Sequence, residues 1–128
     1  MTEVNSFKFF DHLFSDPKKS CKVMEEMQQE GSDWNQTGGM LYWGLKNYLI
    51  ILDFSKQGIS DNKRIASEGK MNPYSVMNLL KHRETLLEKE LFITMFFKEL
   101  VALDYDIKMG RVPAEYFRLR VKELVLMQ

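Results

Sequence analysis

A run of apolar residues at helical spacing between Leu86 and Gly110 constrains the fold of this chain more than any other stretch. Ile93, Phe97 and Leu100 recur at intervals of three and four residues, which is the period of one face of an α-helix. Further apolar residues widen this face: Phe92, Met95, Phe96 and Leu103. A helix that is apolar over so much of its circumference must be covered on more than one side. The stretch therefore predicts one long helix, about 36 Å in length at 1.5 Å per residue, at the centre of a helical fold.

The two ends of this predicted helix carry charged residues. Asp104 and Lys108 are four residues apart, which predicts an ion pair on the helix surface worth a few tenths of a kcal/mol. Gly110 predicts the C-terminal stop of the helix. Charges placed every few residues at both ends make this segment an unsuitable membrane span.

Capping residues, prolines and glycines divide the rest of the chain into further predicted helices. Their expected limits are Asn5 or Ser6 to Ser15, Asp16–Pro17 to Gly31, Ser32 or Asp33 to Gly58, Ser60 to Gly69, Asn72–Pro73 onward, and Val112–Pro113 onward. An N-cap followed by a first-turn proline is a specific helix start, and it occurs at Asp16 and again at Asn72. Three prolines and seven glycines at such positions favour an all-α fold over a sheet.

Several predicted helices have a clear inward face. The first has one side formed by Phe7, Phe10, Leu13 and Phe14, and the second has one formed by Val23, Met24 and Met27. The inward side of the third contains Trp34, Gly38, Leu41, Leu45, Tyr48 and Leu52. The inward side of the last contains Tyr116 or Phe117 together with Val121, Leu124 and Val125. Gly38, Gly39 and Gly44 are costly inside a helix, which predicts a bend or the close approach of a neighbouring backbone.

The length and charge of the chain restrict its class. With 128 residues and a formal net charge of zero, it is expected to form one domain, residues 1–128, with no bulk attraction to nucleic acid or membranes. Cys21 is the single cysteine, so an intrachain disulfide is impossible, and we expect it to be a small core residue. The N-terminus lacks the basic and apolar regions of an export signal, and we expect a cytoplasmic protein.

The residue types that carry chemistry do not form a recognisable pattern. His12 and His82 stand far apart and belong to no HExxH or Cys/His cluster, so we expect no metal site. No GxSxG string supports a nucleophile, and the glycine pair at Gly38 lacks the rest of a phosphate-binding loop. Paired carboxylates stand among lysines on presumed helix surfaces. The sequence therefore predicts no catalytic residue, no cofactor and no small-molecule substrate.

Nucleic-acid binding can be argued in one place. Residues 59–83 have the outline of a helix-turn-helix, two short helices joined by a tight turn. The range from Lys56 to Arg83 contains six Lys or Arg residues and two acids, a local excess of four positive charges. The candidate nucleic-acid contacts are Lys63, Arg64, Lys70, Lys81 and Arg83. The other interpretation is a solvated face of a structural helix pair. We favour it because Pro73, Tyr74 and Ser75 give a recognition helix few base-reading groups, and Tyr74 could equally cover the core.

Four stretches of the chain, in order, carry a family resemblance. They are FFDHLFSDPKKSCKVMEEM, MLYWGLKNYLIIL, QGISDNKRIASEGKMNPYSVMNLLK and LVALDYDIKMG. The third stretch contains a Pro-Tyr-x-V run at Pro73 and Tyr74, and the fourth has the pattern L-x-x-x-D-x-x-x-K-x-G with Asp104, Lys108 and Gly110. Together they resemble the C-terminal domain of the bacterial DNA polymerase III delta subunit, a clamp-loader component, over about residues 7 to 126.

This resemblance implies a compact α-helical collar domain of about five to seven helices. Such a domain packs beside the corresponding domains of the gamma/tau and delta-prime subunits and meets DNA only through the assembled complex. The resemblance also implies a longer delta subunit with N-terminal AAA+ domains, of which this chain is the C-terminal fragment. Pro73, Tyr74, Asp104, Lys108 and Gly110 match the family pattern, and the roles it implies for them are structural. The module is expected to be noncatalytic, although its parent complex is a DNA-directed DNA polymerase.

Overall fold

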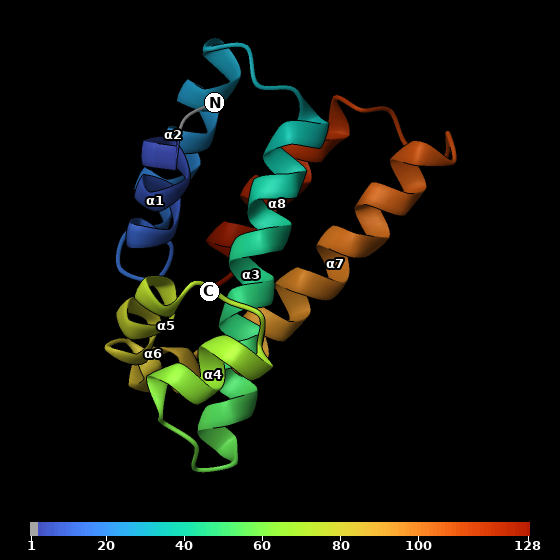
Figure 1. Ribbon diagram of the computed structural model, residues 1–128. Coiled ribbons are helices and arrows are strands. Elements are labelled where there is room, and N and C mark those ends of the chain that lie inside the picture. The colour runs from blue at the N-terminus through green and yellow to red at the C-terminus, as the bar shows by residue number, and fades with distance from the viewer. Residues whose placement is uncertain (1–2) are drawn as a thin grey trace. The chain divides into compact units, whose positions relative to one another are not determined.

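A computed structural model describes residues 3–128, with side chains from residue 8 onward. Within these residues the chain forms eight α-helices and no strand (Figure 1). The helices are α1 (Glu3–His12), α2 (Pro17–Gln29), α3 (Trp34–Lys56), α4 (Asn62–Glu68), α5 (Pro73–Leu80), α6 (Arg83–Glu88), α7 (Glu90–Lys108) and α8 (Tyr116–Leu126). The prediction of an all-α fold is confirmed.

The helices belong to two compact units. The first unit comprises Met1–Trp43 and Phe96–Gln128, and the second comprises Gly44–Met95. The first therefore contains α1, α2 and α8 with the beginning of α3 and most of α7. The second contains α4, α5 and α6 with the remainder of α3 and the first turns of α7.

In the first unit, α1 packs along α2 (Figure 1). Phe9 and Leu13 are fully buried, whereas Phe10 and Phe14 are only partly buried. The predicted inward face was therefore right at Leu13, but it omitted Phe9, which lies four residues before Leu13 on the side toward the core. The side chain of Phe7 lies outside the described residues. The buried Ser20 hydroxyl donates a hydrogen bond to the Phe9 carbonyl at 2.6 Å, which joins the two helices.

Helix α8 closes the first unit against α2. Its buried residues are Phe117, Val121, Leu124 and Val125, as the sequence predicted, with Phe117 rather than Tyr116 as the aromatic member. The Phe117 ring lies 5.9 Å from that of Trp34, and it would lie 3.4 Å from a Cβ at Gly38. The approach predicted at Gly38 therefore comes from an aromatic ring rather than from a backbone.

In the second unit, the segment predicted as one long central helix is divided into α6 and α7. Lys89 has φ −97° and ψ 12°, outside the helical range, and it separates the two. The sequence around it contains no proline or glycine, so no local signal marked this break. Glu90, the first residue of α7, accepts a hydrogen bond from Lys56 at 2.6 Å, and this ion pair holds the start of α7 beside the end of α3.

Side-chain caps start three helices where the sequence predicted them: α2 at Asp16, α3 at Asp33 and α5 at Asn72. The start predicted for the last helix at Val112–Pro113 was wrong, since α8 begins at Tyr116 without a side-chain cap. Asp33 and Gln36 exchange backbone-to-side-chain hydrogen bonds of 2.8 and 3.0 Å at the start of α3, forming a capping box. Asn72 accepts from the Tyr74 backbone N–H at 2.8 Å at the start of α5. For α4 the prediction of Ser60 was wrong: Asp61 is the cap, and it accepts from the Lys63 backbone N–H at 3.1 Å.

Candidate functional site

The described side chains form no cluster that could hold a metal, since no three His, Cys, Asp or Glu residues among them converge. Cys21 is buried in α2, and desolvation by its surroundings raises the pKa of its thiol above the usual 9.0, although nearby Lys122 opposes this. A raised pKa keeps the thiol protonated and weakly nucleophilic. This is the environment of a small core residue, as the sequence predicted.

A hollow in the first unit lies where α2, α3 and α8 meet. Its polar walls include Ser32, Asp33 and Thr37 from the start of α3 and Glu115 and Arg118 from the start of α8. Asp33 is engaged in the capping box, and the described lining contains neither histidine nor cysteine to act as a base or nucleophile. The hollow is thus a depression between helix ends, and its charged lining consists of Asp33, Glu115 and Arg118.

Three of the family-pattern residues lie together at the end of α7. Lys108 Nζ is 3.0 Å from the Asp104 carboxylate, which is the ion pair predicted from their spacing. Gly110 has φ +74°, and the N–H groups of Gly110 and Arg111 bond to the carbonyls of Ile107 and Asp106. This hydrogen-bond pattern is a Schellman motif, whose left-handed position is usually occupied by glycine because glycine has no Cβ. These residues therefore form a helix end on the surface.

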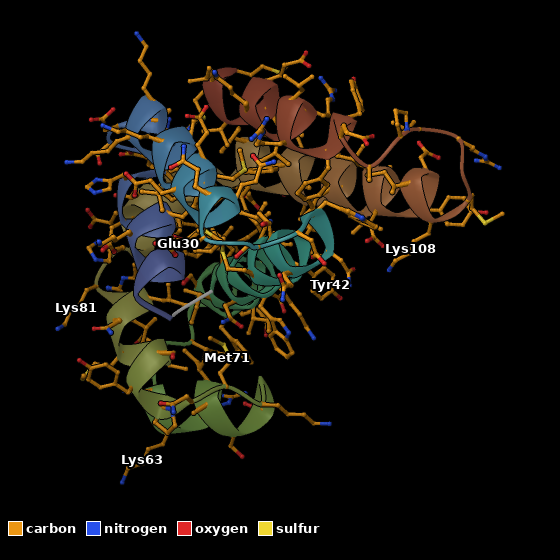
Figure 2. All side chains as sticks on the ribbon, turned by 90° about the horizontal axis from the view of Figure 1, so that it is seen from above. Glu30, Tyr42, Lys63, Met71, Lys81 and Lys108 are labelled. Atoms are coloured by element: carbon orange, nitrogen blue, oxygen red, sulfur yellow. The ribbon has the colours of Figure 1, made fainter. Side chains whose placement is uncertain are left out.

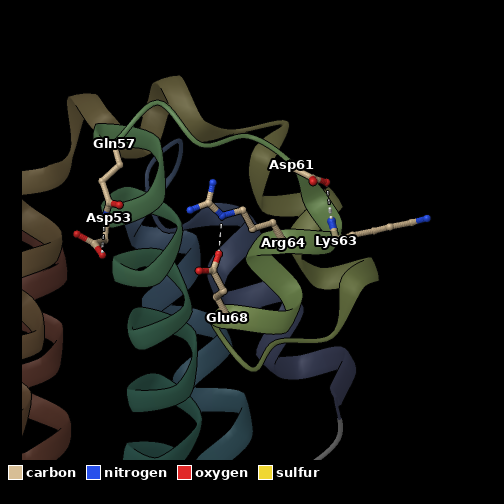
Figure 3. Close-up of polar contacts among 6 residues, drawn as sticks. All are labelled: Asp53, Gln57, Asp61, Lys63, Arg64 and Glu68. Carbon is tan, nitrogen blue, oxygen red and sulfur yellow. Dashed lines mark hydrogen bonds and ion pairs between the residues drawn. The ribbon is translucent and has the colours of Figure 1, made fainter.

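The basic candidates lie in the second unit, and they do not share one environment. Arg64 is paired with Glu68 at 2.7 Å, and Lys56 with Glu90 at 2.6 Å. Figure 3 shows Arg64 turned toward Glu68, while the Lys63 side chain extends away from the ribbon. Among the described residues, the remaining four candidates form no ion pair: Lys63, Lys70, Lys81 and Arg83. We call these four residues the basic face.

Helices α4 and α5 pack against each other as the predicted helix-turn-helix outline required. Pro73 occupies the first turn of α5, and Tyr74 beside it is 67% exposed, so the alternative that Tyr74 covers the core was wrong. Tyr74 and Lys81 are seven residues apart, which places them on one side of α5 about 10 Å apart. Met77 and Asn78, between them, are also exposed.

The turn between these helices contains Gly69 and Lys70. Gly69 has an ordinary helical φ of −83°, but a Cβ there would meet the Ile65 carbonyl oxygen at 2.8 Å and the Ile50 side chain at 3.0 Å. Lys70 has the left-handed φ of +53° instead. Gly69 is thus required for space, and Lys70, not the glycine, reverses the chain after α4.

Sequence reasoning missed an exposed apolar strip in the first unit. On α7 and just beyond it, Val101, Tyr105 and Met109 are 45%, 52% and 57% exposed at intervals of four residues. One turn earlier, the partly buried Phe97 ring lies 5.3 Å from that of the exposed Tyr42 on α3. We call these five residues the apolar strip. The apolar spacing was visible in the sequence, but a core stripe and a surface stripe have the same spacing.

Comparison with known proteins assigns the chain to a family. None of the described helices combines the length and apolar character needed to cross a membrane. A search of curated proteins and a search of solved structures returned no significant match. The model of the family described as "DNA polymerase III delta subunit, C-terminal domain" matches residues 3–125, nearly the whole chain. On this match, and with the all-α fold that the resemblance implied, the chain belongs to the family formed by the C-terminal domain of the DNA polymerase III delta subunit.

Proposed function

We propose that this domain is a noncatalytic assembly module of the clamp loader, in which it packs as a collar domain beside the corresponding domains of the gamma/tau and delta-prime subunits. It would act in the cytoplasm as part of a longer delta subunit. The family membership supports this role, and the apolar strip is the structural observation that carries it.

The strip has the properties of a protein-binding surface. Large apolar and aromatic side chains that stay exposed along a helix mark protein-binding surfaces, because a partner that covers them removes their apolar area from water. The charged groups beside the strip neutralise one another: Asp104 pairs with Lys108, and Asp106 lies 3.5 Å from Arg111. Arg111 also lies 5.3 Å from the Tyr105 ring centre. A surface that is apolar and locally neutral suits another helical protein domain better than a polyanion.

The experiment is co-elution by size exclusion at about micromolar protein concentration. At this concentration a complex with a dissociation constant below about 1 μM stays mostly associated. The chain is mixed with the collar domains of gamma/tau and delta-prime, and we expect one earlier peak that contains all components. Val101→Glu and Tyr105→Glu place charges in the strip and should restore separate peaks. Leu91→Glu is the control, because Leu91 is 88% exposed and belongs to the other unit.

Persistent separation of the unmodified chain from both partner domains would contradict the assembly role. Co-elution that survives Val101→Glu and Tyr105→Glu would retain the assembly role and reject the apolar strip as its surface.

A further inference from the structure

The hollow between α2, α3 and α8 contains a buried hydroxyl group without a partner. Ser32, which lies between α2 and α3, lines this hollow and is only 5% exposed. Its backbone N–H donates to the Met27 carbonyl at 3.0 Å, but its hydroxyl group has no hydrogen-bond partner among the described residues. Buried hydroxyl groups are normally paired, because leaving one unpaired after its removal from water is unfavourable. Ser32 therefore indicates a polar group that this chain does not itself supply.

The hollow belongs to the first unit alone. The end of α2 and the starts of α3 and α8 lie at the same end of this unit in Figure 1. Figure 2 views that end from above, where the label of Glu30 marks the residue after α2. The hollow has a volume of about 250 Å³, which is below the range of about 300–1,000 Å³ for sites that enclose a drug-sized ligand. It therefore has room for one amino-acid side chain rather than for a nucleotide.

The lining of the hollow carries more negative than positive charge. Asp33 and Glu115 contribute carboxylates, and Arg118 is the one cation of the described lining. The Gln36 backbone N–H donates to one oxygen of Asp33 at 2.8 Å, which leaves the second oxygen available. Within residues 8–128, neither Asp33 nor Glu115 forms an ion pair. A cation from outside the chain would therefore meet two carboxylates that no ion pair neutralises.

Aromatic and apolar surface forms another part of the lining. The Trp34 and Phe117 rings, 5.9 Å apart, both line the hollow together with Met24. An arginine guanidinium is planar, stacks on aromatic rings and presents five N–H donors, whereas a lysine ammonium group is a compact and strongly hydrated point charge. A guanidinium therefore matches this mixture of a hydroxyl group, carboxylates and rings better than an ammonium group does.

We propose that this hollow receives an arginine side chain of a partner protein. The guanidinium donates to the Ser32 hydroxyl and to the carboxylates of Asp33 and Glu115, and its flat face lies against the Trp34 ring. Arg118 reduces the negative charge of the site without cancelling it. The contact is separate from the apolar strip, because no residue of the strip lines the hollow.

The test is a nuclear magnetic resonance titration of the isotopically labelled full chain with the peptide acetyl-glycyl-arginyl-glycinamide. We expect the indole signal of Trp34 and the backbone signals of Ser32 and Glu115 to shift, with a dissociation constant of about 1 mM for this single side chain. The same peptide with citrulline in place of arginine keeps the shape but loses the charge. It should bind severalfold more weakly, because hydrogen bonds between charged groups are the stronger ones.

Substitutions of the two charged residues of α8 and its N-terminal cap should have opposite effects. Glu115→Gln removes an attractive charge and should weaken binding about two- to fivefold, whereas Arg118→Gln removes a repulsive charge and should strengthen binding by a similar factor. Glu26→Gln is the matched control for the loss of a carboxylate. Glu26 is exposed on α2 and does not line the hollow, so the dissociation constant should stay the same.

Ser32→Ala tests the unpaired hydroxyl group by two measurements. The variant should bind the arginine peptide severalfold more weakly, because an acceptor is lost. Its midpoint of thermal unfolding should not fall, because the hydroxyl group has no partner to lose in the chain alone. A lower midpoint would mean that the hydroxyl group is already paired within the fold, and it would contradict the proposal.

Three further results would overturn the proposal. They are the absence of shifts in the signals of the hollow at about 10 mM arginine peptide, equal binding of the citrulline peptide, and reversed effects of Glu115→Gln and Arg118→Gln. The reversed effects would indicate an anionic occupant. None of these results bears on the apolar strip, because co-elution of the Val101 and Tyr105 variants tests that surface separately.

Discussion

Ser20 is a buried hydroxyl that stabilises the contact between α1 and α2. It donates to the carbonyl of Phe9, one of the last four carbonyls of α1, which lack partners within their own helix. Ser20→Ala removes this donor and leaves a buried carbonyl unsatisfied, so we expect the free energy of unfolding to fall by about 1–2 kcal/mol. Urea titration followed by circular dichroism measures the change. Ser60→Ala, at an exposed position, is the control, and an equal effect of the two substitutions would refute the role of Ser20.

The burial of Cys21 can be tested by the rate at which a thiol reagent labels it. Its side chain is 3% exposed, and burial raises the pKa of its thiol above 9.0. We therefore expect Ellman's reagent at pH 8 to label the native protein about a hundredfold or more slowly than the protein in urea, because labelling needs local opening. Comparable rates in the two states would place the thiol at the surface.

The same thiol predicts how stability depends on pH. As the pH rises through 9.0, the unfolded chain releases the thiol proton first, because the folded pKa is higher. The free energy of unfolding should therefore decrease above pH 9 until the folded thiol also ionises. Cys21→Ala removes this contribution, so a urea series from pH 8 to 10 should show a smaller decrease for the variant than for the unmodified chain.

At the scale of elements, substitutions of two adjacent residues in the turn between α4 and α5 should change stability in opposite directions. Gly69→Ala adds a Cβ 2.8 Å from the Ile65 carbonyl oxygen, and we expect a loss of about 1 kcal/mol or more despite the better helix propensity of alanine. Lys70→Gly relieves the left-handed φ of +53°, and we expect a gain of about 1 kcal/mol. Thermal melts of both variants test this assignment, and a reversal of the two signs would contradict it.

This turn also shows how far sequence reasoning can reach for an element. Gly69 correctly marked the end of α4. The sequence did not indicate that Lys70 takes the left-handed φ, or that a side chain at Gly69 would meet Ile50, nineteen positions earlier in the chain, as well as the nearby Ile65 carbonyl oxygen. The break at Lys89 was missed for a similar reason. Its flanking residues all favour helix, and the ion pair between Glu90 and Lys56 joins parts of the chain that no local pattern connects. Caps such as Asn72 were predicted because their signal is local.

At the scale of the whole molecule, average composition conceals two different units. The formal net charge is zero, yet the first unit has two more acids than bases, and the second has two more bases than acids. The sequence identified Lys63, Lys70, Lys81 and Arg83 as candidates by counting charges, and it included Arg64 because counting does not reveal its pairing with Glu68. The apolar strip required the structure, since only burial distinguishes the exposed Val101 from the buried Leu100 beside it.

The proposed assembly surface should resist salt. Burial of apolar side chains is insensitive to moderate ionic strength, whereas contacts between exposed charges weaken as salt rises. Because the apolar strip carries the proposed contact, we expect the complex with the gamma/tau and delta-prime collar domains to co-elute at both about 50 and about 300 mM salt. Tyr105→Glu places a charge in the strip and should separate the components at both salt concentrations. If salt dissociated the complex of the unmodified chain, the assignment of apolar assembly to the first unit would be wrong.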